Sequence, residues 1–352
     1  ALAGYSATMR VENVFSLIFV SIGNAVSPYV SQNLGAQKIG RIKKGYHAAL
    51  VLDLCFVGAS IAFALMQKGL FSEMVLIDAN HAKAEGEAMD LSHGLPYTAS
   101  MDIYAGDYKD VADCGLIIIT AGANQKPGET RLDLIEKNVG ILKSIVPQIT
   151  ATAFEGILMI VANPVDVLTY AAQQISGYPV ERVFGSGTVL DTARLKYQVG
   201  RHLDVDSRSV HAVIIGEHGD SELPVWSGAN VSGIDLNHFC ELRGHFNHEA
   251  SMERLYEEVR DSAYEIIERK GIAMAVARIA ESIVKDEHAV LPVSVELQGE
   301  YGLSGLALSI PSVVGKNGIE KVLEIPLNEK EKNALLASAD QLKAVIEKLT
   351  LN

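Results

Sequence analysis

The chain has 352 residues, enough for two domains of ordinary size. With 48% hydrophobic and 21% charged residues, its composition is typical of a globular protein. The net charge of −13 argues against a nucleic-acid partner. Cys55, Cys114 and Cys240 are odd in number and far apart, which argues against a disulfide framework and a cysteine-rich metal site. They suit a reducing compartment, so we expect a cytoplasmic location.

The first 47 residues form a segment unlike the rest of the chain. Up to residue 52 there are five basic side chains and one acidic one, although the whole chain is acidic. Residues 14–31 are uncharged, and at 18 residues they approach the minimum length for crossing a bilayer. A second apolar run, residues 48–66, has Asp53 as its one charge. Asn24 and Pro28 weaken the first run as a span, so we expect buried helix or strand here and no contact with a membrane.

Three stretches in this segment carry a resemblance to a known family: Gly4-Tyr5, Met9–Asn13, and Gln32–Ala36 followed by Arg41. Over roughly 50 residues the segment resembles a piece of the multidrug and toxic-compound extrusion (MATE) transporters. One or two helices do not make a transport pathway, which needs bundled helices around a cavity. We therefore interpret residues 1–47 as a foreign helical fragment without a transport function.

Beyond this segment, apolar strands alternate with helical patterns. The expected strands are residues 48–54, 74–78, 115–120, 157–162 and 183–184, with helices such as 59–68 and 132–150 between them. This alternation predicts an α/β fold with a parallel sheet and right-handed crossovers. We expect a Rossmann-type domain over residues 48–186, which binds its ligand at the carboxyl ends of the strands.

The first turn of such a domain is the expected cofactor site. It normally reads G-x-G-x-x-G between a strand and a helix, with an acidic residue about 20 positions further on. Gly58 stands at the third glycine position, and Asp78 ends the next strand, where a carboxylate binds a ribose. The first two glycine positions hold Asp53 and Cys55, which place a negative charge and a side chain where the phosphates approach. Taken alone, this turn is a weak signal for dinucleotide binding.

The second half of the chain no longer alternates strands and helices regularly. Strands are expected at residues 210–215 and 290–295, and long amphipathic helices at Glu249–Ser282 and Glu329–Leu349. We expect residues 187–352 to form a mixed α+β domain that holds the substrate.

A histidine between glycines is the strongest candidate for catalysis. His218 lies in Gly216–Ser221, directly after an apolar strand, where it has room to face a ligand. In such an arrangement Asp191 accepts a hydrogen bond from one imidazole nitrogen, fixes the tautomer and raises the histidine pKa. Arg194 is suited to hold a carboxylate by a two-point contact. This set fits reduction of a keto acid, since the alkoxide that hydride transfer leaves needs a proton from a group titrating near pH 7.

Two further polar residues lie near the ends of expected strands. Arg131 is the last residue of a Gly- and Pro-containing stretch, residues 122–131. Such a stretch suits a mobile loop that carries the arginine over a bound substrate. Asn163 follows the strand at 157–162 and, like Arg131, is suited to polarise a carbonyl.

Each of these residues taken singly has a plainer explanation. A lone histidine is most often structural, Asp191 and Arg194 fit a surface helix pair, and Asn163 before a proline fits a turn. The joint occurrence at strand ends is what favours a site. His238, His245 and His248 with Cys240 suggest a metal, but their polar surroundings favour a solvated face, and we expect no metal.

Residues 56–352 closely resemble the bacterial L-lactate dehydrogenases, with Ala121–Leu134 and Gly216–Ser221 as the most specific stretches. The resemblance implies an NAD-dependent oxidoreductase of glycolysis and pyruvate fermentation that assembles as a homotetramer. In it His218 is the catalytic acid and base, Asp191 its partner, Arg194 the carboxylate clamp and Arg131 the loop arginine. The implied substrate contacts are Gln125, Arg131, Asn163 and Arg194. The implied cofactor contacts are Val57, Asp78, Lys83, Tyr108, Gly122, Ala123, Ser144, Val161, Asn163 and Ser186, beside Gly58.

The resemblance leaves alternatives open. Malate enzymes usually have Arg at the position of Gln125, so a neutral Gln favours pyruvate over a substrate with a second carboxylate. Some relatives are activated by fructose 1,6-bisphosphate, and His211 matches one contact, whereas Lys196 stands where Arg is usual. A third hypothesis is a membrane-attached chain with an inert dehydrogenase part.

Two departures from the family bear on activity. One is the replaced phosphate turn at Asp53 and Cys55. The other lies between Lys270 and Ile272, where the family has about five more residues, including a threonine of the substrate pocket. A loss of this length also changes which face of the following helix meets the site. We expect weakened NADH binding and reduced turnover.

Overall fold

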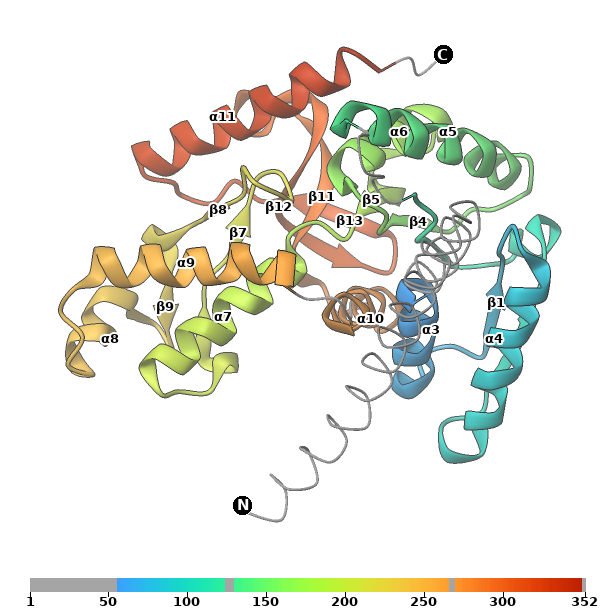
Figure 1. Ribbon diagram of the computed structural model, residues 1–352, viewed down its shortest axis with the longest axis horizontal. Helices are drawn as coiled ribbons and strands as arrows, with labels where there is room; N and C mark the ends of the chain where they lie inside the picture. Colours follow the sequence, from blue (N-terminus) through green and yellow to red (C-terminus); the bar gives the residue numbers. More distant parts are fainter. Residues whose placement is uncertain (1–55, 124–129, 266–269, 350–352) are drawn as a thin grey trace, which may run out of the picture. The chain divides into compact units, whose positions relative to one another are not determined.

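The structure is a computed structural model that describes residues 56–123, 130–265 and 270–349 (Figure 1). The expected strand at residues 48–54, the segment before it and Gln125 lie outside these ranges. Within them, no helix is both long enough and apolar enough to cross a membrane.

The first part of the described chain alternates helices and strands, as the sequence predicts. Its elements are α3 (Phe56–Lys68), β1 (Glu73–Leu76), α4 (His81–Gly94), β2 (Asp102–Ala105), β3 (Leu116–Ile119), α5 (Arg131–Thr150), β4 (Ile157–Ile160), α6 (Val165–Ser176), β5 (Val183–Gly185) and α7 (Val189–Leu203). β1 pairs in parallel with β2, and β3, β4 and β5 pair in parallel in that order. The parallel sheet and the Rossmann-type fold expected from the alternation are therefore confirmed.

The sheet of β3, β4 and β5 continues into the second half of the chain. Its order is β13-β12-β11-β5-β4-β3, where β11 is Ala289–Gln298, β12 is Ser304–Gly315 and β13 is Gly318–Val322. β11, β12 and β13 pair antiparallel, and β11 meets β5 at the single antiparallel pair Ser294–Gly185. One sheet thus crosses the predicted boundary between residues 186 and 187.

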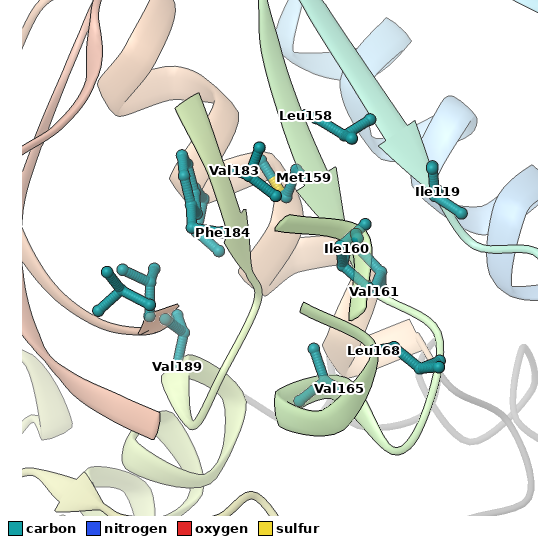
Figure 2. Close-up of a cluster of buried hydrophobic side chains, with 14 of the residues drawn as sticks. Ile119, Leu158, Met159, Ile160, Val161, Val165, Leu168, Val183, Phe184 and Val189 are labelled. Atoms are coloured by element: carbon teal, nitrogen blue, oxygen red, sulfur yellow. The ribbon is translucent and has the colours of Figure 1, made fainter. Parts of the chain in front are cut away.

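The core lies around the central strands. All four residues of β4 are buried, which is typical of a parallel strand that is covered on both faces. Val165 and Leu168 of α6 lie close to the end of β4, and Phe184 of β5 belongs to the same cluster (Figure 2). These side chains fix the carboxyl ends of β4 and β5, where the sequence places candidate site residues.

The second part of the described chain mixes small antiparallel sheets with helices. Its remaining elements are β6 (Val210–His211), β7 (Ile214–Ile215), β8 (Leu223–Pro224), β9 (Asn230–Val231), β10 (Ile234–Asp235), α8 (Leu236–Leu242), α9 (His248–Glu265), α10 (Lys270–Val284) and α11 (Glu329–Ile346). α7 packs against α9, and α11 packs on β12 (Figure 1). This mixture of antiparallel strands and helices matches the α+β fold expected for this part of the chain.

Two predicted elements differ in detail. Residues 210–215 form two short strands, because β6 pairs with β9 whereas β7 pairs with β8. The interval predicted as one helix at Glu249–Ser282 is described as α9 and α10 on either side of residues 266–269.

α10 keeps an apolar face in the core despite the short link before it. Ala273, Val276, Ala277, Ile279 and Ala280 are buried in the main hydrophobic cluster. The chain that follows the departure at residue 270 therefore packs as an ordinary amphipathic helix.

A substitution at Gly185, where β5 meets β11, tests how tightly this part of the sheet is packed. A Cβ added at Gly185 would lie 2.7 Å from Val165 Cγ2 and 3.1 Å from Ser294 Cβ. We expect Gly185→Ala to lower the free energy of unfolding by about 1–3 kcal/mol, because an added methyl group in a packed core forces its neighbours apart.

Gly86 provides the matched control in urea-induced unfolding. It lies inside α4, and a Cβ added there meets nothing within 4 Å. Gly86→Ala should therefore stabilise the protein by about 0.5–1 kcal/mol. An unfolding midpoint for Gly185→Ala equal to that of the unchanged protein would contradict the packing described for this junction.

Candidate active site

The loop that carries His218 is fixed at its start to β12. Gly216 donates its N–H to the Ser309 carbonyl at 3.0 Å and accepts from the Ser309 N–H at 3.0 Å. Its φ of +94° is a backbone conformation that side chains other than hydrogen rarely allow. The glycine before the histidine therefore lets the chain leave the sheet sharply and present His218.

A buried carboxylate holds the backbone of the histidine. Asp166 of α6 accepts the His218 N–H at 2.7 Å on Oδ2, and Ser294 and Ser309 donate to Oδ1 at 2.6 and 3.2 Å. Burial raises the pKa of Asp166 to about 6, although the bonds from Ser294 and His218 oppose the rise. This residue is not among those predicted from the sequence. Its signal was a charged side chain inside the apolar run Val165–Leu168.

Three of the predicted site residues, His218, Asp191 and Arg194, lie together. His218 Nδ1 lies 2.6 Å from Asp191 Oδ2, and Arg194 Nη1 donates to Asp191 Oδ1 at 2.8 Å. Asp191 and Arg194 lie three residues apart on α7 and so project from the same side of the helix. The Asp191 side chain is 3% exposed, whereas those of Arg194 and His218 are 18% and 24% exposed. The aspartate is therefore the buried base of the group, and the cation and the imidazole reach solvent.

The charges of this group reinforce one another. Burial disfavours the charged imidazole, but the Asp191 carboxylate outweighs it and raises the pKa of His218 to about 9. Burial likewise opposes ionisation of Asp191, and the His218 and Arg194 charges nevertheless hold its pKa below the usual value. The arrangement therefore holds a proton on the imidazole over a wide pH range.

The carboxyl end of β1 presents the acidic residue predicted for the cofactor. Asp78 Oδ1 accepts from Asn80 N at 2.8 Å, and Oδ2 accepts from Lys83 Nζ at 2.7 Å. Burial alone would raise the pKa of Asp78, but these two donors lower it below its usual value. At 34% exposure the carboxylate keeps lone pairs open to a ligand.

Gly58 lies where a helix approaches a strand closely. A Cβ added there would lie 3.1 Å from Thr120 Oγ1, directly after β3. This is the helix–strand packing that the third glycine of the dinucleotide fingerprint serves.

A second polar residue missed in the sequence joins two loops of the predicted site. Asn138 of α5 accepts the Ala123 N–H at 2.7 Å and donates to the Asn163 carbonyl at 2.8 Å. It is buried among the apolar residues of one face of α5. A Cβ added at Gly122 would lie 3.3 Å from Ala162 Cβ, so the two loops are also in close contact. The signal in the sequence was an amide on the apolar face of an amphipathic helix.

The other predicted cofactor residues lie on several elements. Val57 lies in α3, Tyr108 begins the 3₁₀ turn Tyr108–Val111, and Ser144 is exposed on α5. Val161 and Ser186 are buried just beyond β4 and β5. These last two, with Gly122 and Ala123, thus follow three neighbouring parallel strands, as expected of a ligand site in such a sheet.

The loop residues are described only in part. Gln125 lies outside the described residues. Arg131 is the first residue of α5, whose start is capped by Thr130: Asp133 N donates to Thr130 Oγ1 at 3.1 Å.

The remaining candidates lie apart from these groups. Lys196 is half-buried on α7, where burial lowers its pKa, and His211 is exposed in β6. Among the described residues, the clusters with metal-ligating atoms in reach of one another are Asp191–His218–Glu222 and Asp286–His288–Glu320. The histidine group around Cys240 is not one of them.

Comparison with known families accounts for nearly the whole chain. The NAD binding domain of the lactate/malate dehydrogenases matches residues 50–185, and their alpha/beta C-terminal domain matches residues 188–351. A further family, MatE, matches residues 1–75.

Similar proteins agree with these matches. An L-lactate dehydrogenase of Acetivibrio thermocellus is 49% identical over 306 residues, which is 86% of this chain and 96% of that protein. L-lactate dehydrogenase 1 of Clostridium acetobutylicum is 47% identical over 85% of this chain and 97% of its own length. The crystal structure of the minor L-lactate dehydrogenase from Enterococcus mundtii in its ligands-bound form has a TM-score of 0.81 at 43% identity, covering 84% of this chain and 96% of that one. With a parallel sheet, a His–Asp–Arg group and these relatives, the chain belongs to the lactate/malate dehydrogenase family.

Proposed function

We propose that the protein is an NAD-dependent L-lactate dehydrogenase, which interconverts pyruvate and (S)-lactate. The observation that carries the proposal is the group of His218, Asp191 and Arg194, in which a buried carboxylate holds both an imidazole and a guanidinium. A 2-keto acid presents a carbonyl to be protonated and, next to it, a carboxylate to be held. The group supplies one donor for each.

His218 acts as acid and base through its outer nitrogen. Because Nδ1 is held by Asp191, Nε2 is the nitrogen that exchanges a proton with the substrate oxygen. Bound NADH supplies the hydride for the carbonyl carbon. His218 then gives its proton to the resulting alkoxide, and in the reverse direction the neutral imidazole accepts the proton of the hydroxyl.

The arginines orient and polarise the substrate. Arg194 uses one amino group for Asp191 and retains further N–H donors for a two-point contact with the substrate carboxylate. Arg131, at the start of α5, and Asn163, after β4, are proposed to donate to the carbonyl oxygen.

The residues around the strand ends fit a nicotinamide dinucleotide. The exposed carboxylate of Asp78 is suited to the ribose hydroxyls, and Gly58 allows the close helix–strand packing of the fingerprint. We propose that Val57, Lys83, Tyr108, Gly122, Ala123, Ser144, Val161, Asn163 and Ser186 complete the contacts.

The choice of pyruvate rests on Gln125. A neutral amide leaves a second substrate carboxylate without a charge partner, which disfavours oxaloacetate and the malate alternative. The similarity to the L-lactate dehydrogenases of Acetivibrio thermocellus and Clostridium acetobutylicum supports the same substrate.

The family also supports wider proposals for this chain. We propose a cytoplasmic homotetramer in which residues 48–186 hold the cofactor and residues 187–352 hold the substrate. Residues 1–47 are a fused fragment outside both domains. Lys196 and His211 are proposed contacts for fructose 1,6-bisphosphate, weakened because lysine lacks the two-point geometry of arginine.

The substrate is tested by following NADH oxidation with pyruvate and with oxaloacetate in parallel. We expect a higher kcat/KM for pyruvate by at least about tenfold, since an unpaired buried charge costs more than 1.4 kcal/mol. Equal or better use of oxaloacetate would contradict the assignment of Gln125.

The role of His218 is tested by His218→Gln, with the exposed His93→Gln on α4 as its control. We expect a loss of about 10²–10⁴-fold in pyruvate reduction for His218→Gln and no change for His93→Gln. NADH binding, followed by fluorescence, should be the same in both variants.

The pH dependence of kcat/KM tests the same role of His218, because the two directions of the reaction need opposite protonation states of its imidazole. Reduction needs the protonated imidazole, so its kcat/KM should fall as pH rises through about 9, whereas lactate oxidation should rise. Parallel profiles in the two directions would contradict a single acid and base.

The altered phosphate turn predicts a KM for NADH above that of the Acetivibrio thermocellus relative assayed alongside. Asp53→Gly with Cys55→Gly should lower this KM several-fold, because a charge at a helix start is worth about 0.3–1 kcal/mol. The control is Asp113→Gly. Asp113 is an exposed carboxylate that precedes the amino end of β3, whereas the ligand is expected at the carboxyl ends of the strands, so this change should leave the KM for NADH unchanged. No gain in the double variant would count against this account of the turn.

A further inference from the structure

A second carboxyl group lies beside the catalytic pair. Glu222 lies between the His218 loop and β8, and only 7% of its surface is exposed. Its carboxyl, that of Asp191 and the His218 imidazole have their polar atoms within 4.8 Å of one another. The Glu222 and Asp191 carboxyl groups are thus close neighbours in a site where both side chains are buried.

The backbone holds Glu222 firmly in this place. Its N–H donates to the Gly219 carbonyl at 3.2 Å, and its own carbonyl accepts the Tyr256 hydroxyl of α9 at 2.6 Å. Because Glu222 is also 7% exposed, the charge state of its side chain depends mainly on the neighbouring groups.

Two carboxyl groups in such contact do not both ionise, because like charges repel strongly where water is excluded. Asp191 is the one that keeps its charge, since His218 and Arg194 both bind it directly. Burial, together with the Asp191 charge, raises the pKa of Glu222 to about 9. For one of the two carboxyl groups to donate a hydrogen bond to the other, it must carry a proton.

We propose that Glu222 is a positioning residue that remains a neutral carboxylic acid and donates a hydrogen bond to the Asp191 carboxylate. Asp191 then has three donors: Arg194, His218 and Glu222. The third donor spreads the negative charge of Asp191 and so limits how strongly it holds the proton on His218. This inference rests on the proposed function and adds a residue that tunes its acid and base.

Other groups around the cluster also influence the charge states of His218, Asp191 and Glu222. The charged or titratable side chains that act on His218, Asp191 and Glu222 are Arg194 of α7, Asp166 of α6 and Tyr256 of α9. Arg194 already supplies a cation to Asp191, which accounts for the charge of the carboxylate without a metal ion.

The experiment compares Glu222→Gln with Glu222→Met. Glutamine keeps a neutral donor of the same length, so the pKa of His218 should stay within about 0.3 of its value in the unchanged protein. Methionine keeps the volume but removes the donor, so the carboxylate of Asp191 should bind the imidazolium more strongly and raise that pKa by about 0.5–1. Glu331→Gln, a buried glutamate that binds Ser227, is the control and should change nothing at His218.

Two readouts separate this proposal from the proposed function. The first is the pH profile of kcat/KM for pyruvate reduction. The second is the imidazole titration of the ¹⁵N-histidine-labelled protein by NMR, assigned with His218→Gln, which needs no activity. A pKa of His218 that falls by about 1 in Glu222→Gln would show that Glu222 is ionised and would overturn the proposal. An unchanged pKa in Glu222→Met would overturn it as well. Absence of pyruvate reduction with the expected NMR titrations would count against the proposed function alone.

Discussion

Two buried carboxylates decide where His218 lies and what it does. Asp166 binds its backbone N–H, and Asp191 binds its imidazole, at 2.7 and 2.6 Å. Asp166 comes from the helix that follows β4, and Asp191 from the helix that follows β5. The position of the histidine therefore depends on the parallel strands, although its own loop belongs to the other half of the chain. Burying these acids is costly, and their hydrogen bonds offset that cost only when the surrounding core is correctly packed.

Hydrogen bonds extend this dependence towards the cofactor side. Asn138 connects the loop at Ala123 with the loop at Asn163, and Asn163 lies three residues before Asp166. One amide and one short segment of backbone therefore connect the β3 loop with the residue that binds the histidine backbone. The arrangement couples the place where a nicotinamide is expected with the group that handles the proton.

The fold and the main site residues could be predicted from the sequence for clear physical reasons. Strand residues such as Ile157–Ile160 are apolar throughout because both faces are covered, and this makes them visible in a single sequence. His218 was found because glycines and a strand end mark its loop, and Asp191 and Arg194 because they follow soon after the end of an expected strand. Asn138, Asp166 and Glu222 were missed because each is a polar residue inside an apolar or ordinary pattern. Only the three-dimensional contact reveals which partner satisfies it.

The pairing of Gly185 with Ser294 has a consequence for the history of the chain. It joins a strand from the part of the chain that matches the NAD binding domain to a strand from the part that matches the alpha/beta C-terminal domain, through one position with no room for a side chain. The two halves match separate families, but at this pair of strands, which we call the seam, each half would have an unpaired sheet edge without the other. A recombination event that exchanged one half with a relative would succeed only if both parents kept the same seam. The MatE match ends at residue 75, far from Gly185 in sequence, and the pair that forms the seam is present in this chain.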